Sequence, residues 1–166
     1  MKKTFKKYAG FTIIELIVVV AIIAVLASIV LVNVTGYINK ARDAAAQGNL
    51  ASMLTGFAMY VADGGAVGTY ANSTTGQTTI AAGSACTGGN AGGNFNSACS
   101  AITTLTASTG YTVTRSQATD AWCACIQMKS PNTNYFCVDS TGNKKTTTTA
   151  CATECPGTGA NAGSCI

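Results

Sequence analysis

Hydrophobic and polar positions divide the chain into parts with different patterns. Residues 11–34 are almost all apolar, with one carboxylate, Glu15, near their start. As a helix these residues span roughly 36 Å at 1.5 Å per residue, which is enough to cross a hydrocarbon core of about 30 Å. By the positive-inside rule, the basic residues before this run keep the N-terminus in the cytoplasm and place the rest of the chain outside it. These basic residues are Lys2, Lys3, Lys6 and Lys7.

After about residue 36 the pattern becomes amphipathic. Apolar residues recur at helical spacing, and Asp43 is among the polar positions between them. Asp63-Gly64-Gly65 is a typical helix stop, because glycine readily adopts the left-handed cap. We therefore expect one helix from about Phe11 to Asp63, roughly 80 Å long at 1.5 Å per residue. The expected apolar face consists of Leu50, Leu54, Phe57, Ala58 and Val61, widened by Met53 and Tyr60.

The remaining sequence predicts a loop followed by a sheet. Residues 64–110 are rich in Gly, Ser and Thr, which predicts a long loop with one short helix around Ala98 and Ile102. From residue 111 to 166, apolar and polar residues alternate around two turns, which predicts an antiparallel sheet of three or four strands and a Cys-rich tail. The predicted fold class is α+β: a long N-terminal α-helix, half transmembrane and half amphipathic, packed on a small antiparallel β-sheet domain with disulfides.

All the cysteines lie in the second half of the chain. An even number in a polar, exported, loop-rich region predicts disulfides. Local spacing favours Cys86 with Cys99 and, across a turn at residues 130–133, Cys125 with Cys137. Eight cysteines allow 105 connectivities, and a zinc site built from closely spaced cysteines is the rival interpretation. Export and the absence of His favour disulfides. The candidates are Cys86, Cys99, Cys123, Cys125, Cys137, Cys151, Cys155 and Cys165.

Charge and residue types argue against an enzyme. Without residues 1–10 the chain has six basic and six acidic side chains, so no basic face favours nucleic acid as a partner, although none of this excludes it. No His is present for a triad or a general base, and no phosphate-loop pattern occurs. We expect no catalytic residues, no metal and no cofactor.

Glu15 is the feature that most needs a function. A carboxylate deep in a membrane helix costs roughly 2.5–3.5 kcal/mol and by default indicates a functional partner. No Lys, Arg or His lies between Phe11 and Asn39, so no cation on the same helix pairs with it. A cut after Gly10 would create an amine on Phe11, one helical turn from Glu15. That amine, in this chain or in a neighbouring copy, is a candidate partner for the carboxylate.

The stretch KKYAGFTIIELIVVVAIIAVLAS resembles the N-terminal signal of type IV prepilins and type II secretion pseudopilins. It has a basic leader, Gly10, Phe11, three intervening residues, Glu15 and a long apolar run. The resemblance implies that a prepilin peptidase cleaves between Gly10 and Phe11 and that Phe11 is N-methylated. It also implies that Glu15 aligns an incoming subunit during assembly. Many pilins carry Gly and Pro in this helix where Ala24 and Val32 stand here, so the resemblance does not extend to local melting.

The resemblance implies a structural subunit of a type IV pilus or a type II secretion pseudopilus. Its partners would be other pilin-like subunits in a homo- or hetero-polymer, the prepilin peptidase, an inner-membrane assembly platform and, before assembly, membrane lipid. It would lie in the bacterial inner membrane with the N-terminus cytoplasmic and the C-terminal domain outside, and later in a filament in the periplasm or at the cell surface. Major pseudopilins of type II secretion often bind calcium in a C-terminal loop, but Asp139 and Glu154 alone are too few for that site.

Five segments and two alternatives follow from this interpretation. One alternative is an uncut, membrane-anchored, extracytoplasmic Cys-rich binding module. The other is a secreted protein that signal peptidase releases near Ala27. The position of leader cleavage distinguishes the pilin-like subunit from these two alternatives. The expected segments are a leader (1–10), a filament-core helix (11–35), its amphipathic half (36–63), the Gly/Ser/Thr-rich loop (64–110) and the sheet with the Cys-rich tail (111–166).

Overall fold

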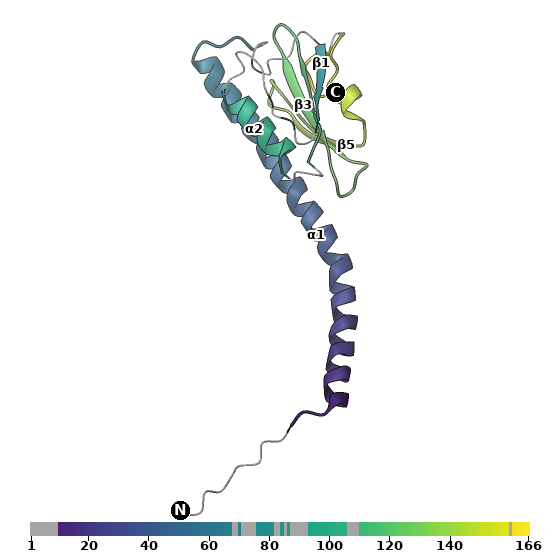
Figure 1. Cartoon of the computed structure of the whole chain (residues 1–166). Helices are drawn as coiled ribbons and strands as arrows, with labels where there is room; N and C mark the ends of the chain where they lie inside the picture. Colours follow the sequence, from purple (N-terminus) through teal and green to yellow (C-terminus); the bar gives the residue numbers. More distant parts are fainter. Residues whose placement is uncertain are drawn as a thin grey trace, which may run out of the picture. The chain divides into compact units, whose positions relative to one another are not determined.

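A computed structural model of the protein divides into two compact units, residues 1–38 and 39–166 (Figure 1). Helix α1, Ile13–Ala62, begins in the first unit and ends in the second, close to the limits that the sequence predicts. The predicted leader lies outside the described residues except for Gly10. The structure describes residues 10–67, 70, 76–81, 84, 86, 93–105, 110–159 and 161–166.

In the first unit, the described residues 13–38 form a helix whose apolar side chains are exposed. Ile13, Leu16 and Leu31 are 77%, 62% and 76% exposed. By length and composition this helix is able to cross a membrane. An apolar surface of this size on every side of a helix needs lipid or other helices around it, because it is costly in water.

The C-terminus of α1 has the cap that Asp63-Gly64-Gly65 predicts. Gly64 has a φ of 85°. Its N–H donates to the Val61 carbonyl, and the Gly65 N–H donates to the Tyr60 carbonyl at 2.9 Å. These two bonds form a Schellman motif, which satisfies carbonyls at the end of the helix. A Cβ at Gly65 would meet the Tyr60 ring at 2.3 Å, so a larger residue at this position would displace that ring.

The sheet has five strands rather than three or four, in the order β1-β2-β3-β4-β5, and neighbouring strands are all antiparallel. The two strands at its edges, β1 and β5, are those that the sequence did not predict. Their sequences are GQTTI and KKTT, which lack the apolar alternation on which strand prediction rests. The strands are β1 Gly76–Ile80, β2 Val113–Gln117, β3 Trp122–Gln127, β4 Tyr135–Asp139 and β5 Lys144–Thr147; the shorter helices are α2 Gly93–Thr103 and α3 Cys151–Glu154.

The two faces of the sheet are covered by different parts of the second unit. The α1 residues of this unit and α2 contribute to one core with the apolar side chains of β2, β3 and β4. The C-terminal segment with α3 lies on the other face, over the cysteines of β3 and β4 (Figure 1). Trp122 and Ala124 alternate with Cys123 and Cys125 along β3 and so belong to different faces, because successive side chains of a strand point to opposite sides.

Trp122 is at the centre of the helix-side core. Its ring lies 5.0 Å from Tyr70, 5.5 Å from Phe57 and 5.9 Å from Phe95, measured between centroids. The face that α1 presents to this core differs from the predicted one. Ala58 and Val61 are exposed, whereas Asp43, Ala46, Leu50 and Met53 are buried. The predicted apolar face is therefore wrong at its C-terminal end.

Candidate functional site

The N-terminal motif places Glu15 in a hydrogen-bonded cap at the start of α1. Thr12 lies just before the first helical residue, Ile13. The backbone N–H and the hydroxyl of Thr12 both donate to Oε2 of Glu15, each at 2.9 Å. The Glu15 N–H donates back to the Thr12 hydroxyl at 3.3 Å. This reciprocal arrangement is a capping box, in which the residues at the N-cap and three positions later satisfy each other's backbone donors.

The capping box adds an uncharged partner to the sequence-based view, which considered only a cation for Glu15 and found none on the same helix. A partner for its hydrogen bonds lies three residues away, although that partner carries no charge. The signal was present in the sequence, because a Thr followed three residues later by Glu at the start of an apolar run is typical of a helix N-terminus. Both bonds from Thr12 go to Oε2. Among the described residues, Oε1 is therefore open to a second partner.

The predicted cleavage position lies just outside the helix. Gly10 is exposed and Phe11 is 85% exposed. A Cβ at Gly10 would meet no described atom within 4 Å, and its φ is not in the left-handed region. Nothing in the described fold of this chain therefore requires glycine at position 10.

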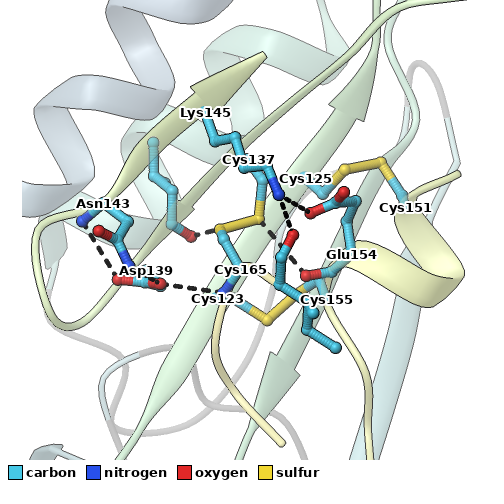
Figure 2. The surroundings of a disulfide bond; sticks show 12 residues. Cys123, Cys125, Cys137, Asp139, Asn143, Lys145, Cys151, Glu154, Cys155 and Cys165 are labelled. Atoms are coloured by element: carbon cyan, nitrogen blue, oxygen red, sulfur yellow. Dashed lines mark hydrogen bonds and ion pairs between the residues drawn. A yellow bond between two sulfur atoms is a disulfide. The ribbon is translucent and has the colours of Figure 1, made fainter. Parts of the chain in front are cut away.

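Every cysteine of the chain is in a disulfide. The predicted pair Cys86–Cys99 is confirmed. The other three disulfides each join a cysteine of β3 or β4 to the C-terminal segment, and all three are drawn in Figure 2. These three pairs are Cys123–Cys155, Cys125–Cys151 and Cys137–Cys165.

The predicted pair Cys125–Cys137 is wrong, although the two residues are neighbours. They are register partners in β3 and β4, so both side chains point to the same face of the sheet. That face is covered by the segment that carries Cys151 and Cys165, and each strand cysteine bonds to this segment instead. The zinc interpretation is also wrong, because zinc binds thiolates and all the cysteines concerned are oxidised to disulfides.

Asp139 joins the β4–β5 turn to the C-terminal segment (Figure 2). Its Oδ1 accepts from the N–H and hydroxyl of Thr141, at 2.9 and 2.6 Å. Its Oδ2 accepts from the Asn143 side chain at 3.0 Å and from the Cys165 N–H at 2.9 Å. Burial alone would raise the pKa of Asp139, but these hydrogen bonds outweigh it and lower the pKa below its ordinary value. The carboxylate is occupied by donors of its own chain.

Glu154 is buried and forms an ion pair, so its carboxylate is not exposed as a ligand of a calcium loop would be. Its side chain is 3% exposed, and Oε2 lies 3.5 Å from Nζ of Lys145 on β5. Lys145 also donates to the Ile166 carbonyl. Among the residues that the structure describes, no group of three or more His, Cys, Asp or Glu side chains is arranged to hold a metal ion.

Asp43 is a structural residue that the sequence did not reveal. It is 2% exposed on α1, and Oδ1 accepts from the Tyr111 hydroxyl at 2.7 Å. The backbone N–H groups of Lys129 and Ser130 donate to Oδ1 and Oδ2, each at 2.8 Å. Burial, together with the bond to Asp43, raises the pKa of Tyr111 above its ordinary value, so the hydroxyl keeps its proton. Asp43 thus fixes the β3–β4 turn to α1.

Comparison with known proteins gives a match at the N-terminus. A family model described as the prokaryotic N-terminal methylation motif matches residues 5–31. No curated protein and no solved structure matches the chain. The match includes Gly10, Phe11, Thr12 and Glu15 and is consistent with the type IV pilin and pseudopilin family. A pilin-type motif indicates a structural protein, and the α+β fold, with its long N-terminal helix, five-stranded sheet and four disulfides, is pilin-like.

Proposed function

We propose that this protein is a structural subunit that polymerises through its N-terminal helix into a type IV pilus or a type II secretion pseudopilus. The observation that carries the proposal is the methylation motif over residues 5–31, on a helix whose apolar side chains are exposed. Such a surface suits lipid before assembly and the helices of other subunits after it. Before assembly the protein lies in the inner membrane, with the disulfide-bonded unit on the extracytoplasmic side, where oxidation occurs.

In this proposal a prepilin peptidase cuts between Gly10 and Phe11, and Phe11 is then methylated on its new amine. The free space around Gly10 supports recognition by another protein, because the fold of the chain itself does not require glycine there. The exposure of Phe11 outside the helix also suits access by a processing enzyme. The proposed segments are those predicted from the sequence: leader 1–10, filament-core helix 11–35, amphipathic half 36–63, loop 64–110, and sheet and tail 111–166.

Glu15 then has two roles in the proposed assembly. Oε2 caps the first turn of α1 through Thr12, and Oε1 is free to accept from the amine of a neighbouring subunit. A pairing of opposite charges in an apolar bundle is specific, because any register that leaves the carboxylate unpaired is penalised. This would align each incoming subunit with the one before it on the assembly platform.

Replacing Glu15 with glutamine separates the two roles. Glutamine serves in a capping box as glutamate does, so the helix start is retained while the charge is lost. We expect Glu15→Gln to lower the yield of filaments by more than about tenfold, because losing one partner of a desolvated charge pair typically costs 2–5 kcal/mol or more. The measurement is the share of the subunit recovered in filaments sheared from cells.

The matched control is Thr12→Ala, which removes the cap and keeps the charge. Loss of an N-cap costs about 1 kcal/mol, so a smaller decrease, about fivefold, is expected. Normal filament yield from Glu15→Gln would show that the charge has no part in assembly. It would leave Glu15 as a helix cap alone.

A further inference from the structure

The exposed charges of the second unit gather at its two opposite ends. Strand β3 runs antiparallel to the part of α1 in this unit, since Trp122 contacts Phe57 and Met128 contacts Gln47. The β3–β4 turn therefore lies near the beginning of that part of α1, and the β2–β3 turn lies near its end. Three cations, Lys40, Arg42 and Lys129, lie at the first end. Two carboxylates, Asp63 and Asp120, lie at the second end, together with one cation, Lys144.

The basic end is a pocket that suits an anion. It encloses about 430 Å³. Arg42 of α1 and Lys129 of the β3–β4 turn line this pocket. Neither forms an ion pair with a described residue, whereas Lys145 does so with Glu154. The nearby Asp43 carboxylate, which accepts from the Lys129 and Ser130 N–H groups, does not offset this charge fully, because it carries one negative charge against two positive ones. The remaining lining residues are Asn39, Gln127, Met128 and Asn132.

The acidic end carries Asp120 on a short turn. The turn between β2 and β3 is closed by the Ala118 N–H, which donates to the Ala121 carbonyl at 2.8 Å. Asp120 is exposed in this turn, and Asp63 is exposed just after α1. Lys144, at the start of β5, lies at this end too, because the β4–β5 turn is on the same side of the sheet as the β2–β3 turn, so the two carboxylates exceed the cation by one charge. In the described part of the chain, neither Asp63 nor Asp120 has an ion-pair partner.

We propose that the Asp120 turn of one subunit docks in the Arg42–Lys129 pocket of the next subunit. This inference rests on the proposed function. The two ends are about 30 Å apart, since α1 rises 1.5 Å per residue between Arg42 and Asp63. Two copies with parallel helices, shifted by that length, bring the basic end of one against the acidic end of the other. Such a head-to-tail contact uses different surfaces on each copy and does not close, so it propagates along a filament.

Charge reversal tests the docking in full-length protein expressed in its host. The tip variant is Asp120→Lys, and the pocket variant is Arg42→Gln with Lys129→Glu. We expect each to lower the share of subunit in sheared filaments by about tenfold, because like charges placed against each other oppose association strongly. A chain with all three substitutions should recover to within about twofold of the wild type. Co-expression of the tip and pocket variants should also restore mixed filaments.

Charge-preserving substitutions are the matched controls. Asp120→Glu and Lys129→Arg keep the complementarity and should assemble as the wild type does. If the tip or pocket variant lost filaments because it misfolded, neither the triple variant nor co-expression would restore them. The intact mass under non-reducing conditions checks that four disulfides form in every variant.

Three results would overturn the docking. Wild-type yield from both the tip and the pocket variants would remove the contact and leave the proposed function standing. The pocket variant could instead lose filament yield that the added tip substitution does not restore, and could also be retained more weakly in membranes. That result would assign the pocket to an anionic lipid headgroup. Failure of the wild-type chain to form filaments at all would overturn both the proposed function and the docking.

Discussion

Reduction of the disulfides is expected to unfold the second unit and to leave the helix of the first unit intact. The three disulfides that hold the C-terminal segment close loops with sequence separations of 26, 28 and 32 residues. Each such cross-link stabilises by about 3.5 kcal/mol in the chain-entropy model. Taken together this approaches the net stability of a small domain, which is typically 5–15 kcal/mol.

The described apolar contacts of the C-terminal segment with the sheet are few. The cluster on that face consists of Cys123, Cys125, Cys137, Cys151 and Cys155, with Tyr135 and Cys165 packed against it. Beyond these, the described contacts are hydrogen bonds, such as that from the Ser116 hydroxyl to the Pro156 carbonyl, and the ion pair of Lys145 with Glu154. Once reduced, the sulfurs no longer restrain the unfolded chain, and this small apolar cluster cannot compensate.

The measurement is urea unfolding of the full chain in detergent micelles, with and without reductant. Trp122 is the single tryptophan and is fully buried, so its fluorescence reports on the second unit alone. Far-ultraviolet circular dichroism reports on α1, whose first part contains no cysteine. A double variant, Cys86→Ala with Cys99→Ala, is the control: it removes the shortest loop, with a separation of 13 residues, and should cost only about 3 kcal/mol. An unchanged urea midpoint after complete reduction would contradict the prediction.

Asp43→Ala is expected to lower the free energy of unfolding of the second unit by about 3 kcal/mol or more. The substitution leaves the Lys129 and Ser130 N–H groups and the Tyr111 hydroxyl without their acceptor. Each buried donor left unsatisfied costs about 1–3 kcal/mol. The loss also frees the β3–β4 turn from α1, so the helix-to-sheet contact weakens at this end.

Graded variants make this prediction specific. Tyr111→Phe removes one donor of the three and should cost about 1.5 kcal/mol, since hydrogen bonds to charged groups contribute about 1.5–3 kcal/mol. Asp120→Ala removes an exposed carboxylate and should change stability by less than about 0.5 kcal/mol. The same Trp122 fluorescence assay measures all three. Equal effects of Asp43→Ala and Asp120→Ala would show that the buried hydrogen bonds do not stabilise the fold.

Local patterns in the sequence were sufficient for the elements that carry their own signal. The long helix, its glycine cap and the two-faced strand around Trp122 and Cys123 all follow from spacing that extends over only a few residues. The capping box of Thr12 and Glu15 has such a signal too, because a Thr followed three residues later by Glu at the start of an apolar run is typical of a helix N-terminus.

Contacts between distant residues could not be predicted in the same way. Asp43 contacts Tyr111, 68 residues away, and nothing near Asp43 in sequence distinguishes it from a solvated position. The cysteines show the same limit. Cys125 and Cys137 were correctly placed opposite each other, but the choice of partner depended on the C-terminal segment, which carries no strong local pattern before α3. Strand β1 is held by pairing with β2 rather than by apolar alternation of its own.

Intact mass and N-terminal fragmentation of the protein from its native membranes test the central claim most directly. The account predicts a chain that begins at Phe11, carries one additional methyl group on its amine, and contains four disulfides. A chain that keeps Met1 would contradict the account, since Glu15 would then have no new amine to meet and the apolar helix would be an anchor only. A chain that begins just after Ala27 would contradict it as well, because the motif and Glu15 would be lost with the signal peptide.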